Sequence, residues 1–259
     1  MHADTTRRGS VLAFVIAAAL SAACNTIYGP TSPDRNWVVH DTQRFALYAR
    51  PGSFGEESAA ALGAILEDQY TDVLAMMELR SSARVSVFLY NSRSQLNPPL
   101  PSDRSGVAFP ETNAVHVVCV PPLDDNLQSL LAHEANHVIV QNGMGRAGTS
   151  FMNEGLASAL VSERHAAIGR TFLYSWARRQ TGPLPAIADL SDDSKWSSSS
   201  DVGYKTSASF LAFLLERHGV TRLKQLYYAS SSEFGTRAQQ IYGRSLQDLE
   251  GEWLAFLGR

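Results

Sequence analysis

Hydrophobic residues recur with two different spacings along the chain, and together these spacings predict an α+β fold. Short apolar segments predict strands at residues 37–39, 44–48, 85–90, 106–109 and 114–120. The first two segments form either separate strands or one bent hairpin. Between the strands, apolar residues at every third or fourth position predict a helix over residues 55–79, and such a stripe is typical of core packing.

The second half of the chain is predicted to be helical. Helical spacing covers residues 126–141, 151–165, 171–178, 204–218, 220–229, 236–242 and 245–257. Loops rich in proline or serine interrupt the pattern at 91–105 and 181–200. The second loop could act as a lid over a neighbouring site, although a plain connector is more common. We therefore expect a small mixed or antiparallel sheet within an N-terminal α+β lobe, residues 37–142, and a helical C-terminal lobe, residues 143–259.

Residues 133–137 read His-Glu-Ala-Asn-His, an HExxH motif inside the predicted helix 126–141. Two histidines at positions i and i+4 lie above one another on one face of a helix, so both imidazoles can reach one metal ion. Glu134 points about a third of a turn away and can lie beside the ion. A Zn²⁺ ion on His133 and His137 would activate a water molecule whose proton Glu134 accepts. The alternative is an amphipathic helix with two surface histidines.

A third metal ligand is expected in the next helix, because a catalytic zinc ion usually has three protein ligands and one open position. Glu154 lies 17 residues after His137, in an Asn-Glu-Gly segment. The intervening chain contains Gly143 and Gly145 and is long enough to end one helix and begin a second against it. The alternative is that Glu154 is a first-turn acid facing the positive end of a helix dipole.

HExxH followed by Asn-Glu-Gly-Leu-Ala resembles the gluzincin branch of zinc metallopeptidases, the peptidase MA-like group, over roughly residues 82–258. The resemblance implies a zincin-like fold in which a strand before the HExxH helix borders the cleft and a substrate backbone can add to its edge. It also implies that Tyr204, at the start of a helix, donates a hydrogen bond to the oxyanion of the tetrahedral intermediate. For the strand, the alternative is an ordinary core hairpin around residues 110–113. For Tyr204, the alternative is a side chain that only packs.

Several residues around the motif have expected supporting roles. Asp124 or Asp125 caps the motif helix. Asn136, inside the motif, either supports the site from behind the ligands or faces solvent. Ser158, one turn after the third ligand, can orient a ligand. His116 faces opposite to its two valine neighbours in a predicted strand and is not counted as a ligand.

Residues 1–23 have the features of an export signal, namely a pair of arginines, a short apolar run and small residues before Cys24. The apolar run is too short for a comfortable transmembrane helix. The last five residues up to Cys24 resemble a bacterial lipoprotein signal, although the leucine lies one position farther upstream than usual. A lipoprotein signal implies membrane anchoring through a lipidated Cys24. The competing interpretation is ordinary signal cleavage before Cys24. Residues 24–36 read as a flexible tether, and we expect an exported protein that is periplasmic, a membrane-anchored lipoprotein of a bacterium, or secreted.

The net charge bears on the choice of binding partners. The formal net charge is −3 at pH 7, and removal of residues 1–23 would leave −4 because Arg7, Arg8 and Asp4 are lost. Such a mild charge gives no reason to expect nucleic acid as a partner.

The chain has two cysteines. If Cys24 is lipidated, Cys119 is a lone and inert thiol in an apolar strand, and a Cys24–Cys119 disulfide is the alternative.

The sequence thus predicts a zinc-dependent peptidase that acts on peptide or protein substrates. His133, His137 and Glu154 would bind Zn²⁺, with Glu134 as general base and Tyr204 as oxyanion donor. A rival hypothesis is a catalytically inactive envelope lipoprotein of zincin fold with a binding or structural role, which would bind metal without hydrolysing peptides. A third is a chance motif on an unrelated helical fold, which predicts that Glu154 lies far from the two histidines. The pattern specifies no oligomeric state.

Overall fold

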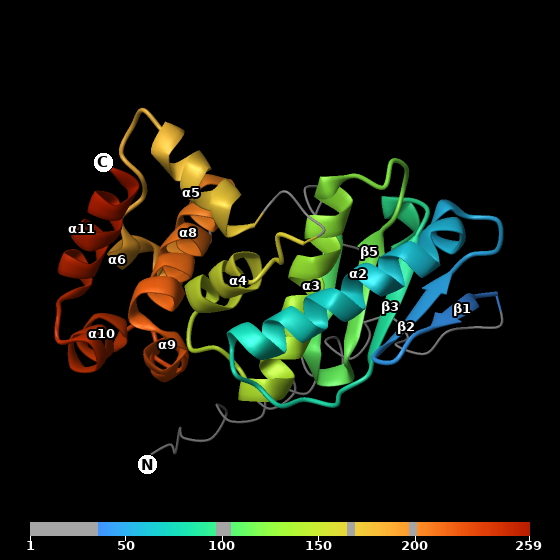
Figure 1. The fold of residues 1–259 in the computed structure, drawn as a ribbon, viewed down its shortest axis with the longest axis horizontal. Helices are drawn as coiled ribbons and strands as arrows, with labels where there is room; N and C mark the ends of the chain where they lie inside the picture. The colour runs from blue at the N-terminus through green and yellow to red at the C-terminus, as the bar shows by residue number, and fades with distance from the viewer. Residues whose placement is uncertain (1–35, 97–104, 165–168, 197–200) are drawn as a thin grey trace, which may run out of the picture.

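A computed structural model of the chain describes residues 36–96, 105–164, 169–196 and 201–259. It shows a five-stranded mixed sheet followed by a helical region, as the α+β prediction requires (Figure 1). The predicted export signal, Cys24, nearly all of the predicted tether and the serine run at 197–200 lie outside the described residues. The expectations for these segments stay predictions.

The strands are ordered β1-β2-β3-β5-β4 across the sheet. Their bounds are Val38–Asp41 for β1, Phe45–Ala49 for β2, Val85–Tyr90 for β3, Gly106–Phe109 for β4 and Ala114–Val118 for β5. The three central strands are parallel, whereas each edge strand pairs antiparallel with its neighbour. Of the two alternatives for the first two segments, the structure shows a hairpin of β1 and β2. The hairpin predicted around residues 110–113 is confirmed and places β4 at an edge of the described sheet.

Two helices cover one face of the sheet (Figure 1). Helix α2, Phe54–Met76, makes the crossover between the parallel strands β2 and β3, and α3, Asp125–Met144, follows β5. Asp124 is the residue that caps α3, because its carboxylate accepts a hydrogen bond from the Leu127 amide at 3.0 Å. Gly145 ends α3 with a φ of +85°, a conformation that glycine adopts without strain.

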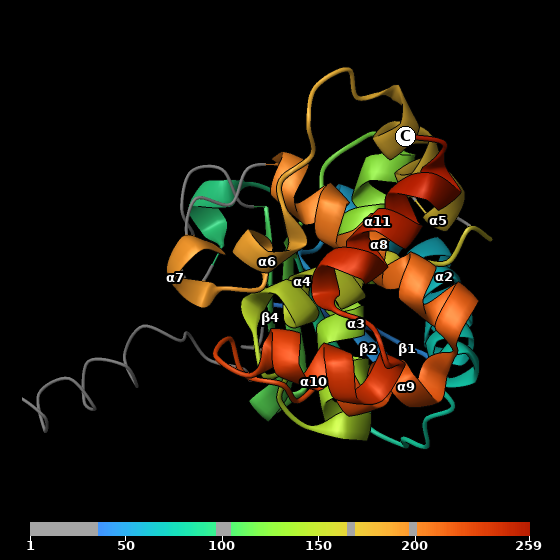
Figure 2. The same ribbon diagram turned by 90° about the vertical axis from the view of Figure 1, so that its left-hand side faces the viewer.

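The helices after α3 form the second part of the molecule. Their bounds are α4 Ser150–Ala159, α5 Arg170–Arg179, α6 Ile187–Leu190, α7 Asp193–Trp196, α8 Asp201–His218, α9 Val220–Leu226, α10 Phe234–Tyr242 and α11 Leu246–Leu257. Viewed from their own side, these helices lie in front of α3 and the strands (Figure 2). One cluster of buried side chains continues from the sheet through α3 to α11. The division of the chain into lobes at residues 142 and 143 stays a prediction.

Helix α4 packs very closely on α8. A Cβ atom at Gly155 would lie 2.9 Å from both the Leu211 Cδ1 and the Ser207 Cβ atoms of α8. Because real Cβ contacts are longer than this, only glycine allows the two helices to approach so far. The glycine of the Asn-Glu-Gly segment therefore has a packing role that does not depend on any chemistry.

The helix predicted over residues 151–165 is shorter than expected, because α4 ends at Ala159. The chain then leaves the helix to make long-range hydrogen bonds to α2. The Leu160 carbonyl accepts from Gln69 Nε2 at 2.8 Å, and the Ser162 amide donates to Gln69 Oε1 at 2.9 Å. These tertiary contacts outweigh the local helical preference of the segment.

Within the described part of the chain, no helix is both long enough and apolar enough to cross a membrane.

Cys119 is a free thiol and is 1% exposed, and burial raises its pKa to about 11. A thiol with this pKa stays protonated at neutral pH, which agrees with the inert role expected for it.

His116 lies in an aromatic cluster on the sheet face opposite α2 and α3. It is fully buried, its ring stacks on Phe88 with centroids 4.6 Å apart, and its Nδ1 atom lies 2.9 Å from the Tyr90 hydroxyl. Burial lowers the pKa of His116 to about 4. The histidine therefore belongs to the core of the sheet and not to a metal site, as expected.

The low pKa of His116 makes the fold sensitive to acid. The unfolded chain takes up a proton at a pKa near 6.5, whereas the folded chain does so only near 4, so the stability that His116 contributes is present above pH 6.5 and is lost as the pH falls towards 4. The loss should reach about 3 kcal/mol. Urea unfolding of the wild type and of His116→Phe between pH 7.5 and 4 measures it. We expect the difference between the two curves to change by about this amount, and two parallel curves would contradict the prediction.

Candidate metal centre

Helix α3 brings the two motif histidines together on one face. The Nε2 atoms of His133 and His137 lie 3.1 Å apart, and the two rings are perpendicular with centroids 4.7 Å apart. This arrangement follows from the spacing of four residues, because one helical turn stacks the two side chains. The core contacts of α3 hold this face toward α4, and His137 is only 8% exposed.

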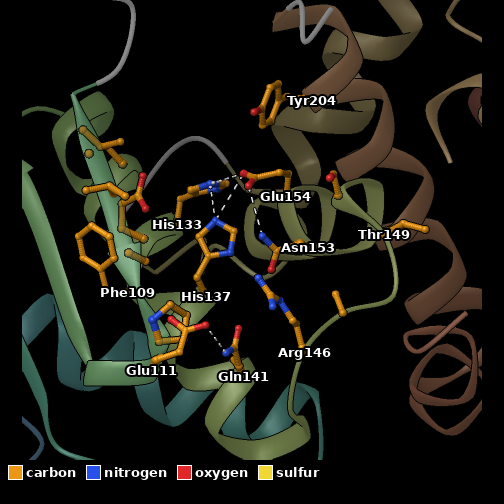
Figure 3. A pocket seen from close by; sticks show the side chains of 18 of the residues that line it. Phe109, Glu111, His133, His137, Gln141, Arg146, Thr149, Asn153, Glu154 and Tyr204 are labelled. Carbon is orange, nitrogen blue, oxygen red and sulfur yellow. Dashed lines mark hydrogen bonds and ion pairs between the residues drawn. The ribbon is translucent and has the colours of Figure 1, made fainter. Parts of the chain in front are cut away.

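Helix α4 supplies the third group. The Glu154 Oε2 atom lies 3.3 Å from His133 Nε2 and 3.4 Å from His137 Nε2. Figure 3 shows the three side chains pointing toward one another from the two helices. Glu154 is the fifth residue of α4, so it is not a first-turn acid. The hypothesis of a chance motif is wrong on its own criterion, because it required Glu154 to lie far from the histidines.

The spacing of these three atoms fits a zinc ion. In a tetrahedral site with bonds of about 2.0–2.1 Å, neighbouring ligand atoms lie about 3.3 Å apart. The three separations here are 3.1, 3.3 and 3.4 Å. Two imidazoles and one carboxylate are also a ligand set typical of catalytic zinc, with room for one further ligand. Among the described residues, this trio is the one group of three such side chains close enough to share an ion.

The charges of the trio favour a cation. Burial alone would raise the pKa of the Glu154 carboxyl, but the hydrogen bonds and charges of the two histidines outweigh it and hold that pKa well below its usual range. Burial alone would lower the pKa of His137, but its hydrogen bond and attraction to Glu154 raise it overall. A proton and a metal ion compete for the same imidazole lone pair, so metal binding is expected to release a proton.

Neighbouring side chains orient two of the three ligands. Ser158 Oγ lies 3.0 Å from His133 Nδ1, so the serine can accept the Nδ1–H and leave the Nε2 lone pair facing the other ligands. Asn153 Nδ2 donates to Glu154 Oε1 at 3.3 Å, which leaves Oε2 for the histidines. The expectation that Ser158 can orient a ligand agrees with this geometry. The contact of Asn153 was not foreseen, although its place next to Glu154 could have suggested it.

The trio lies on the wall of a cleft of about 1350 Å³. The residues on one side come from β4 and the short helix η2, Pro110–Thr112, and those on the other from α4 and α8 (Figure 3). Asp193 of α7 also lines the cleft. The edge strand expected to border the cleft therefore does so. Glu134 also lines the cleft, and a Cβ atom at Gly106 of β4 would lie 3.0 Å from its Cγ and Oε1 atoms. Glycine at this position lets the Glu134 carboxylate lie directly against the strand.

Tyr204 lines the same cleft from the first turns of α8. Its ring packs edge-on against Trp196 with centroids 5.2 Å apart, and it lies on the Glu154 side of the cleft (Figure 3). The structure thus brings all five predicted site residues to one cleft. The packing contact and a catalytic role are compatible, and the roles of Glu134 and Tyr204 stay predictions.

The site also contains polar residues whose function the sequence did not reveal. Asn136 is fully buried, so the alternative that it faces solvent is wrong. It accepts a hydrogen bond from Gln69 of α2 at 2.7 Å. Gln69 was overlooked, although a glutamine between the apolar positions Leu66, Tyr70 and Val73 is a signal of a buried amide.

Comparison with known proteins supports a metal site in this segment. Residues 62–182 match the model of a family described as predicted Zn-dependent protease (DUF2268). The matched range contains both histidines and Glu154 and ends before Tyr204. No curated protein matches the chain.

The hydrogen bond of Ser158 predicts a measurable effect on zinc affinity. Ser158→Ala removes the group that fixes the His133 tautomer, and we expect zinc to bind about 10-fold more weakly, as is usual when such a partner is lost. Competition with a chromophoric chelator measures the affinity. Ser129→Ala is a matched control on α3, because the buried Ser129 hydroxyl has no hydrogen-bond partner in the described structure. Equal affinities in Ser158→Ala and the wild type would show that Ser158 does not support the ligand.

Proposed function

We propose that this chain is a zinc-dependent peptidase that hydrolyses peptide bonds of peptide or protein substrates. The observation that carries the proposal is the meeting of His133, His137 and Glu154 with the spacing of a tetrahedral zinc site. The match of residues 62–182 to a predicted Zn-dependent protease family supports it independently of the geometry.

In this proposal His133, His137 and Glu154 would hold a Zn²⁺ ion at the wall of the cleft. Bound Zn²⁺ would supply Lewis acidity and lower the pKa of a water molecule to near neutrality. Glu134, next to the first ligand and 8% exposed, would act as the general base towards the attacking water and would deliver the proton to the leaving amine. The Tyr204 hydroxyl donates a hydrogen bond to the developing oxyanion.

The edge strand β4 suits the binding of an extended polypeptide. Its inner side pairs with β5, and its residues line the cleft on the side facing the ligands. Among the described strands β4 lies at an edge of the sheet, and an edge strand can pair with an added strand, so a substrate backbone in the cleft would extend the sheet. This binding mode recognises a peptide backbone and places its carbonyl groups beside the ligands.

The cellular setting is proposed from the sequence. The segment before residue 24 supports export, followed either by anchoring through a lipidated Cys24 or by release after ordinary cleavage. The proposed substrates are therefore proteins or peptides of the periplasm, the cell envelope or the surroundings. The competing function is an inactive envelope lipoprotein that keeps the metal site, and the second experiment below separates the two.

Metal content tests the ligand set. The purified chain should contain about one zinc ion, and both His137→Ala and Glu154→Ala should lose it, because two ligands do not hold zinc tightly. Elemental analysis after dialysis gives the stoichiometry. His40→Ala, which removes a histidine of β1 at the edge of the sheet opposite β4, is the control and should keep its zinc. A wild type without zinc after reconstitution would rule out the metallopeptidase.

Glu134→Gln tests the chemistry separately from the metal. The amide keeps the shape of the side chain but accepts no proton, so hydrolysis should fall by about 100-fold or more while zinc content stays the same. Cleavage of a quenched fluorescent peptide library measures the rate. Zinc-loaded wild type that cleaves no peptide in the library would favour the inactive lipoprotein, and undiminished cleavage by Glu134→Gln would exclude Glu134 as the base.

A further inference from the structure

Two buried amide side chains connect three helices directly behind the metal ligands. Gln69 of α2 is 2% exposed and Asn136 of α3 is fully buried. Gln69 Nε2 donates to Asn136 Oδ1 at 2.7 Å, and Asn136 Nδ2 donates to the Ala157 carbonyl of α4 at 2.7 Å. We call Gln69 and Asn136 the amide clamp.

The clamp binds the backbone at the end of α4 rather than its side chains. Besides Ala157, it contacts the Leu160 carbonyl, which accepts from Gln69 Nε2 at 2.8 Å, and the Ser162 amide, which donates to Gln69 Oε1 at 2.9 Å. The last carbonyl groups of a helix have no partner inside the helix and need one elsewhere when they are buried. The clamp supplies these partners, and it does so from α2 and α3.

The clamped groups lie within one turn of the ligands. Asn136 immediately precedes His137, and Ala157 lies three residues after Glu154 and next to Ser158. Ala157 and Glu154 belong to the same turn of α4, because one helical turn contains about 3.6 residues. A displacement of the helix at Ala157 therefore also moves Glu154. Metal bonds tolerate displacements of only about 0.2 Å.

Apolar packing alone would not define this position well. Burial of apolar surface is non-directional, and the close packing at Gly155 fixes α4 against α8 but not against α3. A hydrogen bond restricts both the distance and the angle between the groups that it joins. The bond from Asn136 to the Ala157 carbonyl and the bonds from Gln69 to residues 160 and 162 therefore determine where α4 lies along α3.

We propose that Gln69 and Asn136 are positioning residues that set the geometry of the three-ligand site. The inference rests on the proposed metal function and deepens it. The clamp holds the turn of α4 that carries Glu154 in register with the turn of α3 that carries the two histidines. Neither amide lies in the described lining of the cleft, so the clamp acts on the metal through the backbone of α4 and not by touching it or the substrate.

The test compares metal binding in clamp variants with binding in a variant that is destabilised elsewhere. Asn136→Leu removes both hydrogen bonds of Asn136 at similar volume, including the bond to Ala157 next to the candidate ligands. Gln69→Met removes the three hydrogen bonds of Gln69 but leaves the Asn136–Ala157 bond in place. Leu249→Ala on α11 is the control, because it creates a cavity at a fully buried position remote from α3 and lowers the denaturant midpoint of the metal-free chain. Zinc affinity is measured by chelator competition and the geometry of the site by the visible spectrum of the Co²⁺-loaded chain.

We expect Asn136→Leu to bind zinc 10- to 100-fold more weakly and Gln69→Met to show a smaller loss in the same direction. Both should shift the Co²⁺ spectrum, whereas Leu249→Ala should keep the affinity and the spectrum of the wild type. If Asn136→Leu does not fold, Gln69→Met decides by the same two measurements. Clamp variants that bind zinc like the wild type with an unchanged spectrum would overturn this inference alone. A wild type that binds neither ion would overturn the metal site and the clamp together.

Discussion

The packing of α4 between α3 and α8 is the contact on which the candidate site depends. It brings a carboxylate and two imidazoles from different helices to within 3.4 Å of one another. Gly155 allows α8 to approach α4 closely, and Asn136 bonds the opposite side of α4 to α3. Taking an ionised carboxylate out of water is costly unless opposite charge and hydrogen bonds compensate for it, and here the histidines and Asn153 do so.

Histidine shows how far the surroundings decide what a side chain does. His116 and His137 are both buried, but His116 is stacked among aromatic rings and its pKa is lowered, whereas the carboxylate of Glu154 raises that of His137. The first histidine stays neutral and serves the packing of the sheet. The second lies where a cation is favoured, because an anionic oxygen and a second imidazole face it.

The topology of the sheet explains why the ligands face an open cleft. Within the sheet that the structure describes, β4 lies at the edge and pairs with β5 alone, and its residues line the cleft. The helical region completes the cleft from the other side with α4, α7 and α8. Glu134 lies against Gly106 of β4, so its carboxylate and the edge strand line the same cavity.

Patterns within a few residues of sequence determine many of the helices, the hairpins and two of the three candidate ligands without any tertiary contact. Helical period, strand pairing in hairpins, the cap at Asp124 and the stacking of His133 on His137 all arise between residues close in sequence, where local geometry is enough. Glu154 was a sound candidate because its type and distance from the motif suit a zinc site. Only the tertiary structure decided that its carboxylate meets the histidines, that α4 stops at Ala159, and that Gln69 and Asn136 bind its end. These outcomes depend on partners 17 to 93 positions apart, and no local propensity specifies which of many distant groups will satisfy a buried amide or carbonyl.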